Sequence, residues 1–229
     1  MNLDIFIAGE LVDLCIPTKE FAEKSDWYSW FNDPHINKYL EQGLFPNDPN
    51  SQLDFFERNK KERLLLVISN KKDYIGVISL SDINFIKRKA SVALVVNTKK
   101  DSEYDSLIAL ESMARITEHG FNKMGLDRIT AGQHINLSGW QQRMELLGYR
   151  LEGILRNGFS KGREITDGVS IAANYDDYIK IIKHRGVYWD SSVKMRDRIA
   201  RLPSDKFVDK VYEFFNNYGN VYYDDIYKL

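Results

Sequence analysis

Three short apolar segments in the middle of the chain follow one another with only polar turns between them. They cover residues 64–69, 74–84 and 90–97, and apolar positions alternate along the second. Such alternation is typical of a strand, and tight polar turns join neighbouring strands of an antiparallel sheet. An amphipathic segment with helical spacing then runs from Leu107 to Met124. The sequence therefore predicts an antiparallel meander followed by a long helix.

Weaker patterns extend this centre on both sides. Before it, the sequence predicts a strand pair or bent strand and three helical pieces, at residues 5–15, 18–31, 35–40 and 48–59. After the long helix it predicts a strand, a helix and a two-stranded hairpin, at residues 128–134, 139–147, 149–155 and 164–173. The order of these elements indicates an α/β fold with a mixed sheet in residues 1–175.

The strand pattern ends at residue 175, and helical segments follow. They are expected at residues 178–183, 193–202 and 207–215. The last segment carries an apolar stripe that is followed by four tyrosines, and these residues are Phe207, Val211, Phe214, Phe215, Tyr218, Tyr222, Tyr223 and Tyr227. Residues 176–229 thus form a helical C-terminal extension, which packs either on its own domain or on a second copy as a homodimer.

Composition excludes several classes of partner. The chain has 32 basic and 33 acidic side chains, so it lacks the charge footprint of a protein that binds nucleic acid or an anionic membrane. Its longest apolar run, residues 64–68, is too short to cross a bilayer, and no secretory signal is visible. Cys15 is the only cysteine and is expected to be buried and inert. We expect a cytoplasmic location. The four dispersed histidines predict no metal site.

Four stretches together resemble the GCN5-related N-acetyltransferase (GNAT) superfamily, and most closely its ribosomal-protein N-terminal acetyltransferase branch. They are WFNDPHINKYL at 30–40, YIGVISLSDIN at 74–84, MGLDRI at 124–129 and MELLGYRLEG at 144–153. The resemblance covers roughly residues 5–175. It implies a mixed, splayed central sheet flanked by helices, and acetyl-CoA as the co-substrate.

The resemblance also implies where acetyl-CoA would bind. In the family, the strand before the long helix bonds the pantetheine, which assigns Leu94, Val95 and Val96 to that role. The next loop and the helix start hold the pyrophosphate, because free backbone N–H groups and the helix dipole favour a diphosphate. The remaining cofactor-binding residues are then Lys99, Lys100, Tyr104, Ser106, Leu107, Ile108 and Asn136.

This loop departs from the family pattern, which is Gln or Arg, two residues, Gly, one residue, then Gly or Ala. Those positions fall on Tyr104, Leu107 and Ala109, and residues 99–109 contain no glycine. Carboxylates at 101, 103 and 105 add repulsion, which is ~4 kcal/mol for two unit charges about 4 Å apart at an effective dielectric of ~20. Alternatively, Ser102 or Asp105 caps the helix. The resemblance therefore predicts a degenerate pyrophosphate loop.

Candidate catalytic residues follow from the same resemblance. His134, at the end of its predicted strand, is the candidate general base, and its alternative is an ordinary strand-end histidine. Many GNAT enzymes protonate the leaving thiolate with a tyrosine, but the aligned residue is Met144. The ribosomal-protein branch often uses an earlier serine, which Ser138 matches, and the alternative for Ser138 is a helix cap.

The acceptor site is assigned to the first-helix motif and the central hairpin. The candidate residues are Trp30, His35, Asp82 and Asn84, of which the last two can instead satisfy turn amides. Two functions remain open. The first is an N-acyltransferase, in particular an N-acetyltransferase, acting on a primary amine of a small molecule, an amino sugar or a protein N-terminus. The second is a degenerate, non-catalytic domain that serves as a binding or assembly module.

Overall fold

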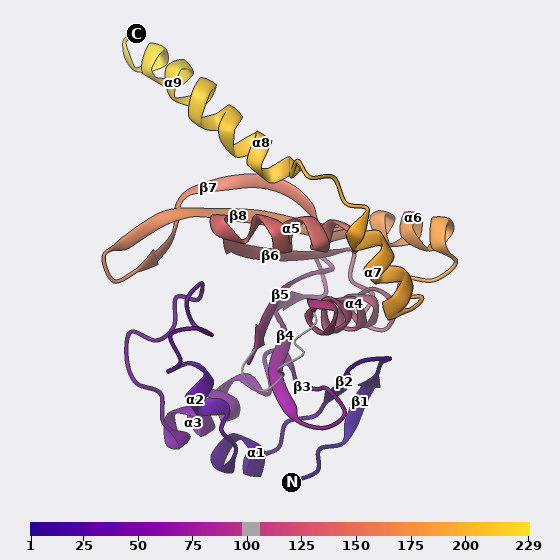
Figure 1. Cartoon of the computed structure of the whole chain (residues 1–229). Coiled ribbons are helices and arrows are strands. Elements are labelled where there is room, and N and C mark those ends of the chain that lie inside the picture. The colour runs from indigo at the N-terminus through magenta and orange to yellow at the C-terminus, as the bar shows by residue number, and fades with distance from the viewer. Residues whose placement is uncertain (98–105) are drawn as a thin grey trace.

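The structure is a computed structural model of the 229-residue chain, and it describes residues 1–97 and 106–229. Its centre is an open sheet with the strand order β1-β2-β3-β4-β5-β6-β8-β7 (Figure 1). The strands are β1 (Ile5–Ala8), β2 (Asp13–Cys15), β3 (Leu64–Ser69), β4 (Tyr74–Asn84), β5 (Lys89–Val96), β6 (Arg128–His134), β7 (Arg150–Lys161) and β8 (Glu164–Asn174). Only β5 and β6 pair in parallel among these neighbours.

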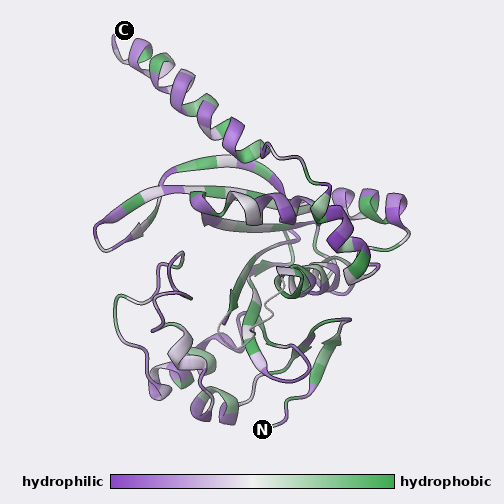
Figure 2. Ribbon diagram, viewed as in Figure 1, coloured by the Kyte–Doolittle hydropathy of each residue, from purple (hydrophilic) through white to green (hydrophobic). Residues whose placement is uncertain are grey.

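The two faces of the sheet carry separate apolar cores. Along β3, Leu65 and Val67 point to one core, and Leu66 and Ile68 point to the other, as the alternation of a strand requires. The smaller core lies under α1 (Lys19–Lys24), α2 (Trp27–Trp30) and α3 (Pro49–Asn59). The larger core lies under α4 (Ser106–Asn122), α5 (Ser138–Glu145), α6 (Tyr175–Arg185) and α7 (Ser192–Ala200). Figure 2 shows the apolar residues concentrated along the strands.

The predicted α/β fold with a mixed sheet is confirmed. The meander at β3–β5 and the long helix lie close to their predicted bounds, and Gly125 follows the helix with φ at +67°. The helical piece predicted at 35–40 is wrong, because this segment forms turns. Cys15 is buried as expected, and burial raises the pKa of its thiol.

The final hairpin is longer than the sequence predicts. β7 runs to Lys161, although a strand ending at residue 155 was expected, because a bulge between Leu155 and Phe159 absorbs the turn-like residues. Gly158 sits in this bulge, where a Cβ atom would lie 2.6 Å from the Leu155 Cβ. The bulge carries the hairpin past the sheet, so that its tip reaches the segment after α2.

The turn between β1 and β2 connects α4 to the segment that precedes α7. Glu111, fully buried in α4, accepts hydrogen bonds from the backbone N–H groups of Glu10 (2.6 Å) and Leu11 (2.7 Å). The Glu10 carboxylate in turn accepts hydrogen bonds from Trp189 Nε1 (3.1 Å) and from the Ser192 backbone (2.7 Å). The early part of the C-terminal extension therefore packs against the α/β body, and the boundary at residue 175 stays a prediction.

The last helical segments leave the body of the molecule. α8 (Phe207–Phe214), a π-helical turn (Phe215–Gly219) and α9 (Asn220–Tyr227) form one rod that projects beyond β7 (Figure 1). Val208 is fully buried at its base, whereas the aromatic residues further along are exposed. Within the described ranges, no helix is long and apolar enough to cross a membrane.

Candidate active site

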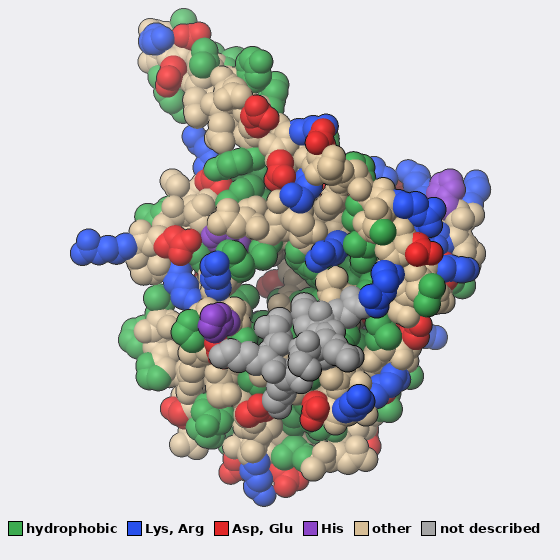
Figure 3. Space-filling model, in the orientation of Figure 1, with side chains coloured by type: hydrophobic (Ala, Val, Ile, Leu, Met, Phe, Trp, Pro, Cys, Tyr) green, Lys and Arg blue, Asp and Glu red, His purple; other side chains and the backbone are tan. Residues whose placement is uncertain are grey.

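β5 and β6 run together only at their starts. Their pairing covers Lys89–Arg128, Ala90–Ile129 and Ser91–Thr130, and the last pair brings Ser91 Oγ within 2.9 Å of Thr130 Oγ1. Beyond this point β5 stays with β4 and β6 stays with β8, so the two halves of the sheet diverge (Figure 1). Figure 3 shows a hollow between these halves, with Lys and Arg side chains near it. On the edge that faces away from β4, the diverging part of β5 has no described strand beside it, so the backbone groups on that edge remain for a ligand.

Leu94, Val95 and Val96 lie in this diverging part of β5, where the resemblance places them. Leu94 and Val96 pack on the larger core, and Val95 packs on the smaller one. Because their side chains point to the two faces of the sheet, the backbone edge of β5 is what lines the gap between the strands.

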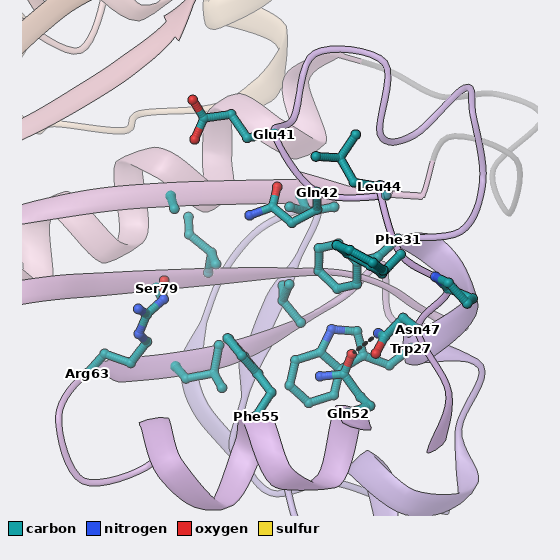
Figure 4. A pocket seen from close by; sticks show the side chains of 18 residues that line it. Trp27, Phe31, Glu41, Gln42, Leu44, Asn47, Gln52, Phe55, Arg63 and Ser79 are labelled. Atoms are coloured by element: carbon teal, nitrogen blue, oxygen red, sulfur yellow. Dashed lines mark hydrogen bonds between the residues drawn. The ribbon is translucent and has the colours of Figure 1, made fainter. Parts of the chain in front are cut away.

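A cavity of about 580 Å³, which we call the main pocket, lies between the helices α2 and α3 and the strands β3–β5 (Figure 4). The segment 41–47 covers it, and Ala93 and Val95 bring its wall onto the diverging part of β5. The walls are largely apolar, and their larger members include Phe31, Phe55, Leu65, Val77 and Ile78. The main pocket therefore adjoins the gap between β5 and β6.

Two buried hydrogen-bond donors line the main pocket without a partner. Trp27 is 0 % exposed, and its Nε1–H group has no acceptor among the residues that the structure describes. Gln52 is 2 % exposed; its Oε1 accepts a hydrogen bond from Asn47 Nδ2 at 2.9 Å, while its Nε2 has no partner (Figure 4). A buried donor left unpaired costs roughly 1–3 kcal/mol. These two groups can therefore bind an acceptor atom of a ligand.

One carboxylate and one guanidinium accompany these donors among the described residues of the main pocket. Glu41 belongs to the covering segment and is exposed. Arg63 is half-buried, with its Cζ atom 5.7 Å from the centre of the Phe55 ring. The two charges offset each other, so the pocket is apolar and close to neutral.

The segment 31–47 follows α2 and is held by the half of the sheet that contains β6, β8 and β7. Lys161, near the tip of the β7–β8 hairpin, donates to the backbone oxygen (2.7 Å) and to the Oδ1 atom (2.8 Å) of Asn37. Asn37 Nδ2 donates to the Phe31 oxygen at 2.7 Å. The Tyr39 ring lies 4.9 Å from the His134 ring on β6. The segment therefore spans the open end of the gap, and these long-range contacts explain why 35–40 is not helical.

His134 is buried at the end of β6, between the rings of Tyr39 and Phe159. Its Nδ1 accepts the backbone N–H of Asn136 at 3.1 Å, and its Nε2 lies 3.6 Å from Glu164 Oε1. In the neutral ring the proton is then on Nε2, so neither nitrogen offers a free lone pair. His134 caps the short helix that follows it, and its role as general base stays a prediction.

Ser138 and Asn136 follow His134 on the same arm of the gap. Ser138 is the first residue of α5 and is half-buried, but Leu137 is the N-cap and no side chain caps this helix. The helix-cap alternative for Ser138 is therefore wrong. Asn136 is exposed. In the part of the chain that the structure describes, no group of three His, Cys, Asp or Glu side chains is arranged to hold a metal ion.

The predicted pyrophosphate site is only partly visible. Lys99, Lys100 and Tyr104 lie outside the described residues, so the degenerate loop stays a prediction. Ser106 begins α4 and is half-buried. Leu107 is 1 % exposed, and both its side chain and that of Ile108 belong to the larger core. Only the backbone of these two residues is then available to a phosphate.

The four predicted acceptor residues lie away from the main pocket. Trp30 is buried in the smaller core, one helical turn from Trp27, and His35 is exposed beside the Asp33 side chain. Asp82 and Asn84 lie at the β4–β5 turn, where the gap is closed. Asn84 Oδ1 accepts the Lys87 N–H at 2.8 Å. Asn84 thus binds a backbone amide of the turn, which was the alternative to a role in the acceptor site.

Sequence reasoning missed the polar residues that line the main pocket, which are Trp27, Glu41, Gln42, Asn47, Gln52, Arg63 and Ser79. One signal was present for Gln52. It stands four residues before Phe56, on the face of α3 that the apolar spacing marks as buried. A polar residue on a buried helix face is a candidate for binding.

Comparisons with known proteins agree with this geometry. The Acetyltransferase (GNAT) domain family matches residues 18–150, more than half of the chain. The fold resembles that of spermidine N-acetyltransferase from Vibrio cholerae in complex with CoA and spermine, with a TM-score of 0.65, 16 % identity, and coverage of 74 % of this chain and 98 % of that one.

Two further solved structures share the fold. An acetyltransferase of the GNAT family from Bacillus anthracis has a TM-score of 0.62 and 20 % identity, over 75 % of this chain and 99 % of that one. The microcin C7 self-immunity acetyltransferase, in complex with acetyl-CoA and AMP, has a TM-score of 0.61 and 18 % identity, over 72 % of this chain and 93 % of that one. No curated protein matches the sequence. The match over residues 18–150 shows that the chain belongs to the GNAT acetyltransferase family.

Proposed function

We propose that the protein is an acetyl-CoA-dependent N-acetyltransferase that acts on a primary amine of a small molecule, an amino sugar or a protein N-terminus. The observation that carries the proposal is the divergence of β5 from β6 beside a pocket of about 580 Å³. Two proteins of the same fold were solved with CoA or acetyl-CoA bound, which supports acetyl-CoA as the co-substrate.

The backbone edge of β5 suits the co-substrate. Bound acetyl-CoA would supply an acyl thioester. Beyond Ser91, the backbone N–H groups of β5 that point away from β4 have no described strand beside them, so they can donate to the pantetheine and to the thioester oxygen. Fixed donors of this kind stabilise the negative charge that develops on that oxygen.

The main pocket suits the amine. We assign the acceptance of the ammonium proton to Glu41, directly or through water, because Glu41 lines the pocket whereas the Nδ1 lone pair of His134 accepts the Asn136 N–H. The free amine then attacks the thioester carbon, so a C–N bond forms and the C–S bond breaks without a covalent enzyme intermediate. The attacking nitrogen loses its extra proton as the amide forms, and we propose that Ser138, on the opposite arm, relays a proton to the leaving thiolate and regains one from that nitrogen, so that its hydroxyl is restored.

A calorimetric titration with acetyl-CoA tests the proposal. We expect binding, followed by release of free thiol when an amine is added. The opposite result, no binding and no rise in melting temperature at millimolar acetyl-CoA, supports the non-catalytic alternative, which the glycine-free residues 99–109 favour. The test is sensitive because a ligand at 100 times its Kd stabilises a protein by about 2.7 kcal/mol.

We also propose that a second copy of the chain covers the exposed rod formed by α8 and α9. Beyond residue 212 of this rod, six aromatic residues are about half exposed or more, and these are Phe214, Phe215, Tyr218, Tyr222, Tyr223 and Tyr227. If each buries roughly 100 Å² of a ring surface of ~150–250 Å², two copies bury about 1,200 Å². That area reaches the lower limit of a stable interface, and a twofold contact of one patch with itself is the commonest homo-oligomeric arrangement.

A further inference from the structure

We propose that the main pocket selects an amine whose apolar body carries a carbonyl-type oxygen, as in an amino-acid amide or an amino acid, and that it discriminates against polyamines. The proposal rests on the proposed function, since the ligand in question is the acyl acceptor. It narrows the acceptors named there to those that carry such an oxygen, and it excludes polyamines.

The first argument is the pair of unpartnered donors on the helix side of the main pocket. Trp27 Nε1 on α2 and Gln52 Nε2 on α3 are both buried, and both lack an acceptor. The bond from Asn47 Nδ2 to Gln52 Oε1 leaves the NH₂ end of Gln52 as the free end. Two donors without acceptors complement an oxygen that has two lone pairs. A ligand carbonyl satisfies both groups at once.

The second argument is the charge of the main pocket. Polyamines carry several ammonium groups, and each buried ammonium needs an anionic or acceptor partner. Among the described lining residues, Glu41 is the one carboxylate, and Arg63 offsets its charge. The remaining walls are mostly aromatic and aliphatic, for example Phe31 and Phe55. The pocket therefore favours an apolar body with one amine over a chain of cations.

The third argument is the placement of the donors relative to the reacting strand. Trp27 and Gln52 belong to the helix side of the main pocket, whereas Ala93 and Val95 form its wall on β5. A ligand that spans the pocket with its oxygen at the helices places its other end toward β5. An amine a few bonds from its carbonyl group, as in an α-amino amide, thus has its nitrogen on the side of the gap between β5 and β6.

The experiment compares four amines with the full-length protein. Phenylalaninamide and phenylalanine carry the carbonyl oxygen, neutral in one and anionic in the other, whereas 2-phenylethylamine lacks it and spermidine is a polyamine. We expect kcat/KM for the better carbonyl-bearing ligand to exceed that for 2-phenylethylamine by about tenfold or more. A preference for phenylalanine would show that the natural acceptor carries a carboxylate, which Arg63 would pair. A preference for the amide would show that it carries a neutral carbonyl group.

The four amines differ in basicity, which by itself changes kcat/KM. Two variants therefore test whether the donors of the main pocket recognise the carbonyl oxygen. Trp27→Phe removes the indole N–H, and Gln52→Glu keeps an oxygen for Asn47 while replacing the free NH₂ by an oxygen. In each variant the ratio of kcat/KM for the carbonyl-bearing ligand to that for 2-phenylethylamine should fall about tenfold. Gln52→Glu should also raise spermidine turnover. Asn50→Asp, the same loss of an amide NH₂ on the exposed surface of α3 and outside the pocket lining, is the control and should keep the ratio.

The outcomes distinguish this proposal from the proposed function. If the protein acetylates amines but the ratio is the same in wild type and both variants, or if spermidine is the best wild-type substrate, the carbonyl proposal is wrong while the acetyltransferase stands. If no amine is acetylated, the Kd of phenylalaninamide, measured by calorimetry, still tests whether the main pocket binds a ligand of this class. A Kd weakened about tenfold in Gln52→Glu, but not in Asn50→Asp, supports the pocket assignment, and an absence of binding to the wild type overturns it.

Discussion

The side-chain amide of Asn47 donates a hydrogen bond to Gln52 Oε1 over 2.9 Å, and this bond decides which end of the Gln52 amide faces the main pocket. Asn47 is itself held by the Asn32 side chain, which accepts the Asn47 N–H and donates to the Asn47 carbonyl oxygen, both over 2.7 Å. The direction of one buried donor thus depends on the segment that covers the pocket.

Replacing Asn47 by Leu should make the acceptor preference weaker without removing activity. The backbone bonds to Asn32 remain, but Gln52 loses the partner that orients it, so either end of its amide can face the ligand. We expect the kcat/KM ratio of phenylalaninamide to 2-phenylethylamine to fall about fivefold, which corresponds to a lost bond of about 1 kcal/mol. An unchanged ratio with an unchanged melting temperature would contradict the orienting role.

Replacing Lys161 by Met should raise KM for the acceptor more than it changes kcat. Lys161 ties Asn37 to the β7–β8 hairpin through two hydrogen bonds, and without them the covering segment samples open positions. Steady-state kinetics at saturating acetyl-CoA measure the effect, which we expect to be about three- to tenfold in KM. The exposed Lys183→Met on α6 is the matched control. Equal KM values in both variants would show that the hydrogen bonds of Lys161 to Asn37 do not hold the covering segment in place.

The pair formed by Asp190 and Arg198 should make the stability of the C-terminal segment depend on pH. Hydrogen bonds from Arg198 hold the pKa of the Asp190 carboxyl far below its usual range. A lowered folded pKa stabilises the fold above the unfolded pKa of about 3.9 and loses that contribution as the pH falls toward the folded pKa. Asp190→Asn should therefore cost about 2 kcal/mol of unfolding free energy near neutral pH.

Urea denaturation of wild type and Asp190→Asn, between about pH 7 and pH 3, measures this difference. It should be largest near neutral pH and should shrink below about pH 4, where the wild-type carboxyl begins to lose its advantage over the unfolded chain. A difference that stays constant over this range would show that the ionised carboxylate is not the source of the stability.

Leu107→Gly should destabilise the protein. The family pattern places a glycine at this position, but the Leu107 side chain is buried in the larger core. Its removal leaves a cavity and adds the helix cost of glycine, so we expect a loss of roughly 3–5 kcal/mol in urea denaturation. A loss under about 1 kcal/mol would show that the start of α4 does not need this side chain.

Removal of residues 213–229 should abolish dimerisation and leave catalysis intact. The truncated chain keeps Val208, the buried anchor of α8, and loses the exposed aromatic residues. Sedimentation velocity at micromolar concentration should give a dimer for the full chain and a monomer for the truncated one. A full-length monomer would contradict the proposed second copy.

The strands and the long helix were predictable because their signals are local. Alternation along 74–84 and helical spacing from Leu107 depend only on neighbouring residues, and each element buries the face that its spacing indicates. The segment 35–40 was not predictable, because its shape depends on Lys161, which lies 124 residues from Asn37 in sequence. The extension of β7 was hidden by a bulge that looks like a turn.

The candidate site was predictable only in outline. Leu94, Val95 and Val96 lie in the diverging part of β5, on the strand that the resemblance indicates, whereas their role in binding the pantetheine stays a prediction. The donors of Trp27 and Gln52 could not be inferred in this way. What distinguishes them is that each is buried and lacks a partner, and that depends on how α2, α3 and the strands come together rather than on the residue type.

The hydrogen bonds of Glu10 also set an order of events during synthesis. Its carboxylate is bound by Trp189 and Ser192, which lie 179 and 182 residues further along the chain. A ribosome releases the N-terminal hairpin long before these partners exist, so the Glu10 carboxylate of the nascent chain stays in water until residues 189–192 have been made. The α/β body can therefore acquire its sheet early, but its N-terminal turn is fixed only after these later residues have left the ribosome.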